Sequence, residues 1–535
     1  MLAGTAAQET AGRIEGTIVD GATGNPVEGV SVSLDSPGGS GAVTTDAEGR
    51  FSFENVRPGT RVLHTSRAGY LPVRPEGRRI PRLESQLNTA GDTGPYATSG
   101  RDSPFYGIPV AVGAGETASE TIRILPVPVV SGRVFDLRGE PVREVTVVPF
   151  RYTYDAVTGE RTILEGRGVT TNDRGEFRFN ALEPGEYGFR VVPSTLDLGR
   201  IAARYFYSTW YPGATNLSSA EMVDVRSGEE TRLRDMTMVS AAAGPRLWLQ
   251  VSGDGTWSVE GRVSVRVRPA GQSDDMRAGT VPAGERIDVG EWPQGAYEVA
   301  AEFRGPSGAS RARQIVDLAA ADTEARLILP APVTLTGRVV DASTGEPVPG
   351  VRAELTPTRA GLAGQRLLSN GDGSFGRPGL GLPLAADTYR ITVTGVPEGM
   401  HLAGIETDGR DVRNDPVELR PGQSVELVVS LAGPAGRVAG TVVDDGGREV
   451  PGAVVVLVPE DRGQRQSFAA TLADAEGAFD VRHAPGVYGL YAWPELDGAA
   501  YRNPRFMSRF EDRGVVVRVE PGGELFGQLT ILDGP

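Results

Sequence analysis

Two residue types that carry much of protein chemistry are missing from the sequence. Its 535 residues include no cysteine, which excludes disulfide bonds and thiolate catalysis but does not exclude secretion. They also include no lysine, so that all 54 basic residues are arginine. Without lysine the chain cannot form a Schiff base, a phosphate-binding loop of the Walker type or a Lys–Asn isopeptide cross-link.

Long apolar runs and a positive net charge are also missing. The longest strongly apolar stretch, at 452–459, is far too short to cross a bilayer. The formal net charge of −15 argues against nucleic-acid binding, which needs clustered basic residues to replace the counterions on phosphates. We therefore expect neither a membrane span nor a nucleic-acid partner.

The composition that remains indicates several soluble domains rich in turns. A chain of 535 residues is too long for one hydrophobic core. The 72 glycines and 39 prolines make up about a fifth of it, which is below the ~25–30% that signals low complexity. Residues 1–11 resemble the end of a secretory signal, with small residues at Thr5, Ala6 and Ala7. We expect a leader remnant followed by an exported chain, at the cell surface, outside the cell or in the periplasm.

Two phrases recur along the chain. The first, "EGTIVDGATGNPVEGVSVSL" at 15–34, returns at 131–150, 336–355 and 439–458. The second, "TTDAEGRFSFENVRPGTRVL" at 44–63, returns at 171–191, 369–393 and 472–491. A fifth unit, at 243–331, lacks the first phrase but ends like the others, with "WPQGAYEVAAEF" at 292–303. Such self-similarity is typical of a tandem array.

Within each unit apolar and polar residues alternate, which predicts half-buried β-strands. Phe177 and Phe179, for example, face one way, and Glu176 and Arg178 face the other. Five units of about 107 residues each have the size of a seven-strand sandwich. We predict an all-β protein, a tandem array of Greek-key β-sandwich modules of the transthyretin-like or immunoglobulin-like kind, without a helix of ten or more residues. The predicted domains are 12–127, 128–242, 243–331, 332–432 and 433–535.

An acidic, glycine-containing loop precedes the Phe-rich strand in four units. It reads Asp46-Ala47-Glu48-Gly49 in the first and Asn172-Asp173-Arg174-Gly175 in the second. Calcium binding would need several converging oxygen ligands, and each loop offers only one or two carboxylates. Asp or Asn early in a turn accepts bonds from its own backbone, and Gly supplies a positive φ. We predict a hairpin turn rather than a metal site.

These phrases carry a family resemblance. The pattern G-x-V-x-D-x-x-G-x-P-V-x-G-V, followed by T-D-x-x-G-x-F-x-F-x-x-L-x-P-G-x-Y, resembles the carboxypeptidase regulatory-like domain, most closely at 16–70 and 132–187. The resemblance implies a transthyretin-like (prealbumin-like) sandwich. Segments 207–230 and 492–524 are similar to parts of large bacterial exported proteins built from tandem copies. The resemblance implies fold and export rather than an activity.

Catalytic chemistry is not predicted. The enzymes that give the family its name bind zinc through an H-x-x-E pair, but none of His64, His401 and His483 is followed by Glu at the third position. We expect His64 to be a solvated surface residue. No G-x-S-x-G elbow is present. We predict no catalytic residue, metal or cofactor, although the 69 acidic residues leave a pair of catalytic carboxylates open.

The densest aromatic cluster contains Tyr205, Phe206, Tyr207, Trp210 and Tyr211. These residues are candidates for a platform on which sugar rings stack, with Tyr205, Tyr207, Trp210 and Tyr211 as the contact residues. The favoured interpretation is that they close the end of a sandwich, since large aromatic side chains mostly serve cores. The charged runs at 76–82 and 505–513 are interpreted as solvated loop faces.

Our first hypothesis is a non-enzymatic, exported, rod-like array with a role in surface structure, adhesion or filament assembly. The alternatives are a carbohydrate-binding accessory protein, with a surface glycan as partner, and a hydrolase that uses carboxylates alone. Open sheet edges make strand addition physically easy. We expect head-to-tail self-association between the last strand, at 523–532, and the first, at 12–20, by strand addition or by end-on packing.

Overall fold

The structure is a computed structural model. It describes residues 11–34, 41–71, 108–180, 182–194, 196–197, 204–242, 244–272, 276–305, 308–359, 362, 364–376, 381–474 and 476–533. Residues 1–10 of the predicted leader and the charged run at 76–82 lie outside the described residues. In the described part the one α-helix, α2 (Pro504–Met507), has four residues, and no helix is long and apolar enough to span a membrane. The protein is all-β, as predicted.

Module 1 is a sandwich of two four-stranded sheets, with the orders β4-β1-β8-β6 and β3-β2-β5-β7. Ile14 and Ile18 from one sheet and Val32 and Leu63 from the other meet in its core. The strands are β1 (Gly12–Asp20), β2 (Ser31–Leu34), β3 (Val43–Thr44), β4 (Arg50–Val56), β5 (Gly59–Ser66), β6 (Tyr70–Leu71), β7 (Ile108–Val112) and β8 (Thr117–Pro126).

Module 2 pairs the sheet β13-β9-β19, with β20 also on β9, against β11-β10-β14-β17, with β12 on β10 and β18 on β14. Its strands are β9 (Val129–Asp136), β10 (Thr146–Tyr154), β11 (Arg161–Glu165), β12 (Val169–Thr170), β13 (Glu176–Phe179), β14 (Gly185–Val192), β17 (Thr209–Trp210), β18 (Val223–Val225), β19 (Glu230–Arg232) and β20 (Met236–Met238). Between β17 and β18 lies a 3-10 turn, η2 (Leu217–Ser219). Phe177 and Phe179 are buried in the core, as the alternation predicted.

Module 3 has the same plan although its first phrase is missing. The sheet β25-β22-β28 faces β24-β23-β26-β27. Its strands are β22 (Arg246–Gly253), β23 (Arg262–Pro269), β24 (Arg277–Pro282), β25 (Arg286–Glu291), β26 (Gly295–Gly305), β27 (Gly308–Leu318) and β28 (Thr323–Leu329). Module 2 reaches into it, because β15 (Leu196–Asp197) pairs with β24. Strands β16 (Arg204–Phe206) and β21 (Ser240–Ala242) pair at the same joint.

Modules 4 and 5 complete the array. Module 4 contains the sheets β32-β29-β37-β34-β35 and β31-β30-β33-β36, and module 5 contains β41-β38-β44 and β40-β39-β42-β43. The strands of module 4 are β29 (Val333–Asp341), β30 (Arg352–Pro357), β31 (Gln365–Leu368), β32 (Leu382–Leu384), β33 (Asp387–Thr394), β34 (His401–Thr407), β35 (Arg410–Asp411), β36 (Val417–Leu419) and β37 (Ser424–Ala432). Those of module 5 are β38 (Gly436–Val443), β39 (Val454–Pro459), β40 (Ala469–Leu472), β41 (Ala478–His483), β42 (Gly486–Trp493), β43 (Val515–Val519) and β44 (Glu524–Thr530). Three 3-10 turns also belong to module 5: η3 (Arg465–Ser467), η4 (Ala500–Arg502) and η5 (Glu511–Arg513).

One topological feature is common to the five modules: the first strand pairs in parallel with a closing strand. The pairs are β1 with β8, β9 with β19 and β20, β22 with β28, β29 with β37, and β38 with β44. Because parallel strands run in the same direction, the chain enters a module at one end and leaves at the other. Residues 127–128, 330–332 and 433–435 are the short links between successive modules. The exact domain boundaries of the sequence analysis stay a prediction.

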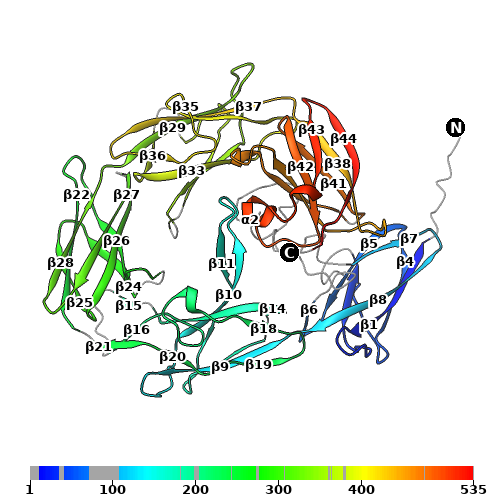
Figure 1. The fold of residues 1–535 in the computed structure, drawn as a ribbon, viewed down its shortest axis with the longest axis horizontal. Coiled ribbons are helices and arrows are strands. Elements are labelled where there is room, and N and C mark those ends of the chain that lie inside the picture. Colours follow the sequence, from blue (N-terminus) through cyan, green and yellow to red (C-terminus); the bar gives the residue numbers. More distant parts are fainter. Residues whose placement is uncertain are drawn as a thin grey trace.

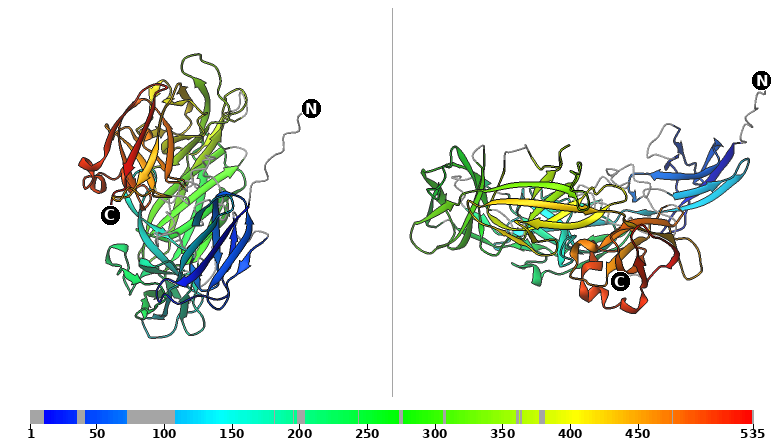
Figure 2. Two further views of the ribbon diagram at one scale, coloured as in Figure 1. Left: turned by 90° about the vertical axis from the view of Figure 1, so that its right-hand side faces the viewer. Right: turned by 90° about the horizontal axis from the view of Figure 1, so that it is seen from above.

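The array is not a straight rod, which corrects the shape we expected. The modules follow a curve that brings module 5 back to module 2, where the β10–β11 hairpin lies beside α2 (Figure 1). Direct contacts hold the two modules together, including the ring contact of Tyr154 with Phe506 and a hydrogen bond from Asn503 to Gly159. Two further views show that modules 1 and 5 do not lie in one plane (Figure 2). The alternation of apolar and polar residues predicts the strands of each sandwich, but it carries no information on the angle between successive modules.

Candidate functional site

The recurring acidic turns are structural. Oδ1 of Asn172 accepts hydrogen bonds from the backbone N–H groups of Arg174 and Glu176, each at 2.9 Å. Asp46 does the same toward Glu48 and Arg50, and the bond from the Arg50 backbone lowers the pKa of Asp46 most strongly. These carboxylate and amide oxygens are therefore occupied by the turn itself.

The prediction of a hairpin is correct only at the turn. Asn172 and Glu176 close it with a backbone bond of 3.0 Å, but the flanking strands then separate. β12 pairs with β10 in one sheet, and β13 pairs with β9 in the other. The turn therefore carries the chain from one sheet of the sandwich to the other. Pairing partners far away in the sequence decide this, and the local pattern does not reveal them.

The turn glycine also joins the two recurring phrases. The carbonyl of Gly175 accepts a 2.9 Å hydrogen bond from the backbone N–H of Val134 on the first strand of module 2. Gly175 has φ +71°, and a Cβ at this position would lie 2.4 Å from the Val134 oxygen. Only glycine combines this backbone angle with so close an approach.

Other polar residues of the phrases also bond to the backbone. The hydroxyls of Thr45 and Ser369 are buried and bridge the loop of the first phrase, each donating to a carbonyl and accepting from an N–H. A tyrosine near the end of the second phrase donates its hydroxyl to the carbonyl four residues earlier, at Tyr389 and Tyr488, and Tyr297 of the divergent module does the same. The recurring polar side chains serve the fold of each module.

The histidines do not assemble a metal site in the described residues. No group of three or more His, Cys, Asp or Glu side chains among them could hold a metal ion. His483 donates Nε2–H to the Ser467 carbonyl at 2.9 Å and packs against Tyr488, and burial lowers the pKa of both His483 and His401. The expectation of a solvated His64 is wrong, since it is 8% exposed. Its strand, β5, is an inner strand of its sheet, because it pairs with β2 on one side and with β7 on the other.

Three of the predicted aromatic contact residues, Tyr207, Trp210 and Tyr211, are partly or fully buried. Trp210 and Tyr211 are 9% and 5% exposed and pack within module 2, where the ring of Trp210 lies edge-on to Phe150. Tyr207 is half-buried and packs against the core of module 3. The backbone of Tyr205 pairs with Ala241 in the joint between modules 2 and 3.

The described residues do not supply a pair of carboxyl groups suited to acid–base catalysis. Among the described carboxyl groups whose pKa is shifted, burial raises the pKa of Glu120, and the others are held below their ordinary range. Two neighbouring carboxyl groups with pKa values pushed apart, which acid–base hydrolysis requires, are not found in this part of the chain.

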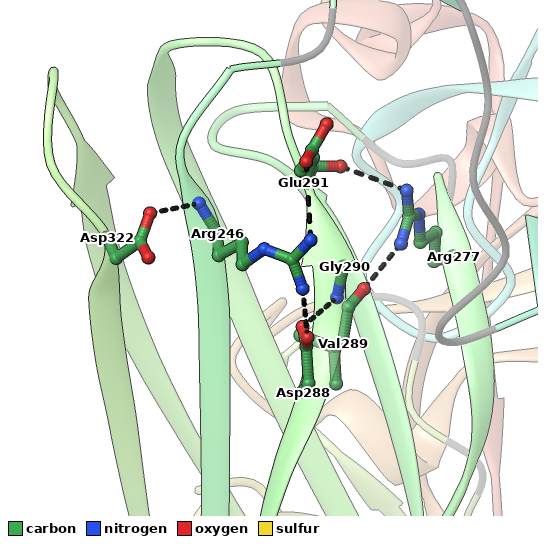
Figure 3. A network of polar contacts seen from close by, with 7 residues as sticks. All are labelled: Arg246, Arg277, Asp288, Val289, Gly290, Glu291 and Asp322. Atoms are coloured by element: carbon green, nitrogen blue, oxygen red, sulfur yellow. Dashed lines mark hydrogen bonds and ion pairs between the residues drawn. The ribbon is translucent and has the colours of Figure 1, made fainter.

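A buried arginine that the sequence analysis missed lies at the joint between modules 2 and 3. Arg277 is fully buried, and its Nη2 donates to the Glu291 carbonyl at 3.0 Å and its Nη1 to the Val289 carbonyl (Figure 3). Its guanidinium carbon lies 4.5 Å from the centre of the Trp292 ring. Burial lowers its pKa. Beside it, Arg246 pairs with Asp288 (Figure 3). The network braces the strand that receives β15 from module 2.

The segment between β42 and β43 is not the solvated loop that we expected at 505–513. Phe506, Met507 and Phe510 are buried, and together with Trp493 they cover the outer face of the β39 sheet. β39 is consequently buried on both faces over its whole length. The continuous apolar run "VVVLVP" could have indicated this burial. A strand that is covered on one face alternates apolar and polar residues, whereas an unbroken apolar run is typical of a strand that is covered on both faces.

This added layer also holds module 2. The backbone N–H of Ala499 donates to the Tyr154 carbonyl at 3.3 Å, and Nδ2 of Asn503 donates to the Gly159 carbonyl at 2.8 Å. The ring of Tyr154 packs edge-on against Phe506 at 6.0 Å. We call this contact between the β10–β11 hairpin and residues 499–506 the clasp.

Exposed large apolar side chains lie at the outer edge of module 5. β43 and β44 are the end strands of their sheets and lie side by side (Figure 1). Val515 and Val516 on β43 are 48% and 76% exposed, and Phe526 on β44 is 65% exposed. We call this surface the terminal edge. Sheet edges with exposed apolar side chains are sites of strand pairing, and natural proteins normally guard them.

The first strand is not an open edge, which corrects the strand-addition hypothesis at the N-terminal end. β1 is paired on both sides, with β4 and with β8. The open edges of module 1 in the described residues are β4, β6, β3 and β7. Chain order does not place a strand at the edge of a sheet, because the last strand of the module inserts beside the first.

The fold and these contacts define a tandem β-sandwich protein. Residues 13–88 match the family model of the carboxypeptidase regulatory-like domain, so the chain contains this domain at its N-terminal end, as the resemblance implied. Modules 2, 4 and 5 repeat its turn, in which the glycine N–H donates to the carbonyl three residues earlier. No curated protein matches the chain.

Solved structures with similarity to the chain include three bacterial pilins. The Streptococcal ancillary pilin is 15% identical over 54% of this chain and 99% of its own, with a TM-score of 0.19. The major pilin subunit BcpA of Bacillus cereus is 11% identical over 57% and 99%, with a TM-score of 0.16. The shaft pilin spaA from Lactobacillus rhamnosus GG is 10% identical over 44% and 99%, with a TM-score of 0.19. Values this low carry no argument about function.

Proposed function

We propose that this protein is a non-enzymatic, exported scaffold that assembles at the cell surface through its terminal edge. The observation that carries the proposal is the pair of adjacent end strands, β43 and β44, with large apolar side chains exposed on both. An edge of this kind presents unpaired backbone groups together with apolar surface, which is what strand addition uses.

The occupant that we propose is a second copy of the chain. The terminal edge of one copy meets an open edge of module 1 of the next, β4 or β7, so that the contact is head to tail. Such a contact joins different surfaces and need not close, so that repetition gives a filament or a layer. The recurring polar residues support a scaffold role, since they bond to the backbone within each module.

Introducing charged side chains at the terminal edge tests whether this surface mediates assembly. The double variant Val516→Arg/Phe526→Arg places two charges on exposed positions, so it leaves the core intact but opposes burial of the edge. We expect the wild-type protein to gain mass with concentration in light scattering and the double variant to remain monomeric.

The matched control is Leu137→Arg. Leu137 is 64% exposed in a turn of module 2, so the same charge is added on an exposed apolar residue away from the edge. This variant should associate like the wild type. A wild-type protein that stays monomeric at high concentration, or a loss of association in the control as large as in the double variant, contradicts the proposal.

A further inference from the structure

A charged cleft lies between modules 3 and 4, away from both the clasp and the terminal edge. Its volume is about 380 Å³. The outer faces of β23, β26 and β27 form one wall, and the beginning of β33 and residues 418–421 form the other. None of its lining residues was singled out by the sequence analysis.

A small side chain in the middle of the sheet creates the depression. Ala300 on β26 pairs with Arg266 on β23 and with Arg313 on β27. Side chains directly opposite each other in neighbouring strands lie on the same face of a sheet. The alanine methyl group therefore leaves a space flanked by two guanidinium groups, which module 4 covers from the other side.

Positive charge is in excess in this cleft. Four carboxylates of the described residues line it, and each has an arginine within 4.0 Å: Arg268 and Arg313 at Glu298, Arg266 at Glu302, Arg311 at Asp387 and Arg420 at Glu418. The lining arginines number six: Arg266, Arg268, Arg311, Arg313, Arg359 and Arg420. Among the described lining residues the guanidinium groups therefore outnumber the carboxylates by two (six against four).

Arg311 is the most enclosed of these arginines and is incompletely bonded. Its side chain is 12% exposed, and its Nε and Nη1 are buried without a hydrogen-bond partner among the described residues. Its ion pair with Asp387 spans 3.6 Å, which exceeds hydrogen-bonding distance. Buried donors without acceptors are costly, so an acceptor from outside the chain stabilises this position.

We propose that the cleft between modules 3 and 4 binds a small solute that carries oxyanion groups. The guanidinium fork matches the geometry of carboxylate, sulfate and phosphate alike. The described lining residues include no aromatic side chain on which a neutral sugar ring could stack, so recognition is ionic. The volume accommodates a tricarboxylate or one acidic sugar unit. The inference goes beyond the scaffold role and does not depend on assembly.

Titration calorimetry of the full chain tests the site with four probes: citrate, inorganic sulfate, inorganic phosphate and neutral glucose. Low ionic strength is used because salt screens the partly exposed arginines. We expect saturable binding at one site per chain for at least one of the three anions and none for glucose. Binding of citrate alone assigns the site to carboxylates, and binding of sulfate or phosphate assigns it to tetrahedral oxyanions.

The test variant is Arg266→Gln/Arg313→Gln, in which Glu302 keeps Arg304 and Glu298 keeps Arg268 as a partner, so that no carboxylate is stranded. Loss of two charged donors should weaken binding at least about tenfold. The control is Arg326→Gln on β28, which is 73% exposed and leaves Glu324 paired with Arg286. It should bind like the wild type. The proposal is overturned if no anion gives saturable heat at concentrations on the order of 10 mM, or if the double variant and the wild type bind with equal affinity.

Discussion

At the scale of single residues, most of the recurring positions can be understood from the sequence alone. Asp or Asn followed by Gly predicts a turn, and Asn172 and Gly175 form one. The second role of the glycine, its approach to the first strand, could not be predicted because it depends on tertiary packing. For the same reason the burial of His64 was missed: alternation identifies the polar face of a strand but not how far neighbouring strands cover it.

The two roles of the turn glycine can be separated in module 4. Gly373 and Gly345 have nearly equal φ values of +74° and +73°, but a Cβ on Gly373 would lie 2.7 Å from the Val339 carbonyl oxygen, whereas a Cβ on Gly345 would have no atom within 4 Å. Gly345→Ala should cost only the backbone strain, about 1 kcal/mol. Gly373→Ala should cost clearly more.

Amide exchange in β29 of the full-length protein measures the difference, because Val339 donates its N–H to Gly373. We expect faster exchange at Val339 in Gly373→Ala than in Gly345→Ala. Equal exchange in the two variants would show that backbone angle alone demands glycine here.

At the scale of elements, alternation located the strands, while additions to the sandwich were missed. The run "RFMSRFEDR" contains as many charges as a surface loop, yet its apolar residues cover the outer face of β39. Segments without regular periodicity give little indication of which side chains turn inward. The aromatic cluster shows the opposite outcome, since core burial of Trp210 and Tyr211 agrees with the favoured interpretation of large aromatics.

Removal of one aromatic ring tests the outer layer of module 5. Phe506 is 3% exposed and contacts Trp493, Phe510 and Tyr154. Phe506→Ala should destabilise module 5 by about 3–5 kcal/mol, the usual cost of such a cavity. The neighbouring Arg505→Ala, at an exposed position of the same helix, should change stability by no more than about 0.5 kcal/mol. Calorimetric unfolding of the full chain measures both effects. Similar unfolding transitions for the two variants would show that the segment is a solvated loop and not a packed layer.

At the scale of the whole molecule, the sequence predicts how many sandwiches there are but not how they are placed. Parallel pairing of first and last strands and short links make the modules follow one another end to end. Side-chain contacts also join neighbouring modules, such as the ion pair of Arg311 with Asp387 and the packing of Tyr207 on module 3. The clasp then joins residues that are 344 positions apart in the sequence.

Small-angle X-ray scattering of the wild type and of Gly159→Arg tests the closed array most directly. Gly159 has φ +68°, and a Cβ there would lie 2.6 Å from Cβ of Arg502, so a large side chain wedges the clasp apart. Gly139→Arg is the control, with φ +79° and no atom near the added Cβ. Five modules with a radius of gyration of ~13 Å each would form a rod about 160 Å long, with a radius of gyration of about 50 Å. We expect a radius of gyration well below this value for the wild type and for Gly139→Arg, and a clear increase for Gly159→Arg. A wild-type protein that already scatters as a rod of that length would contradict it.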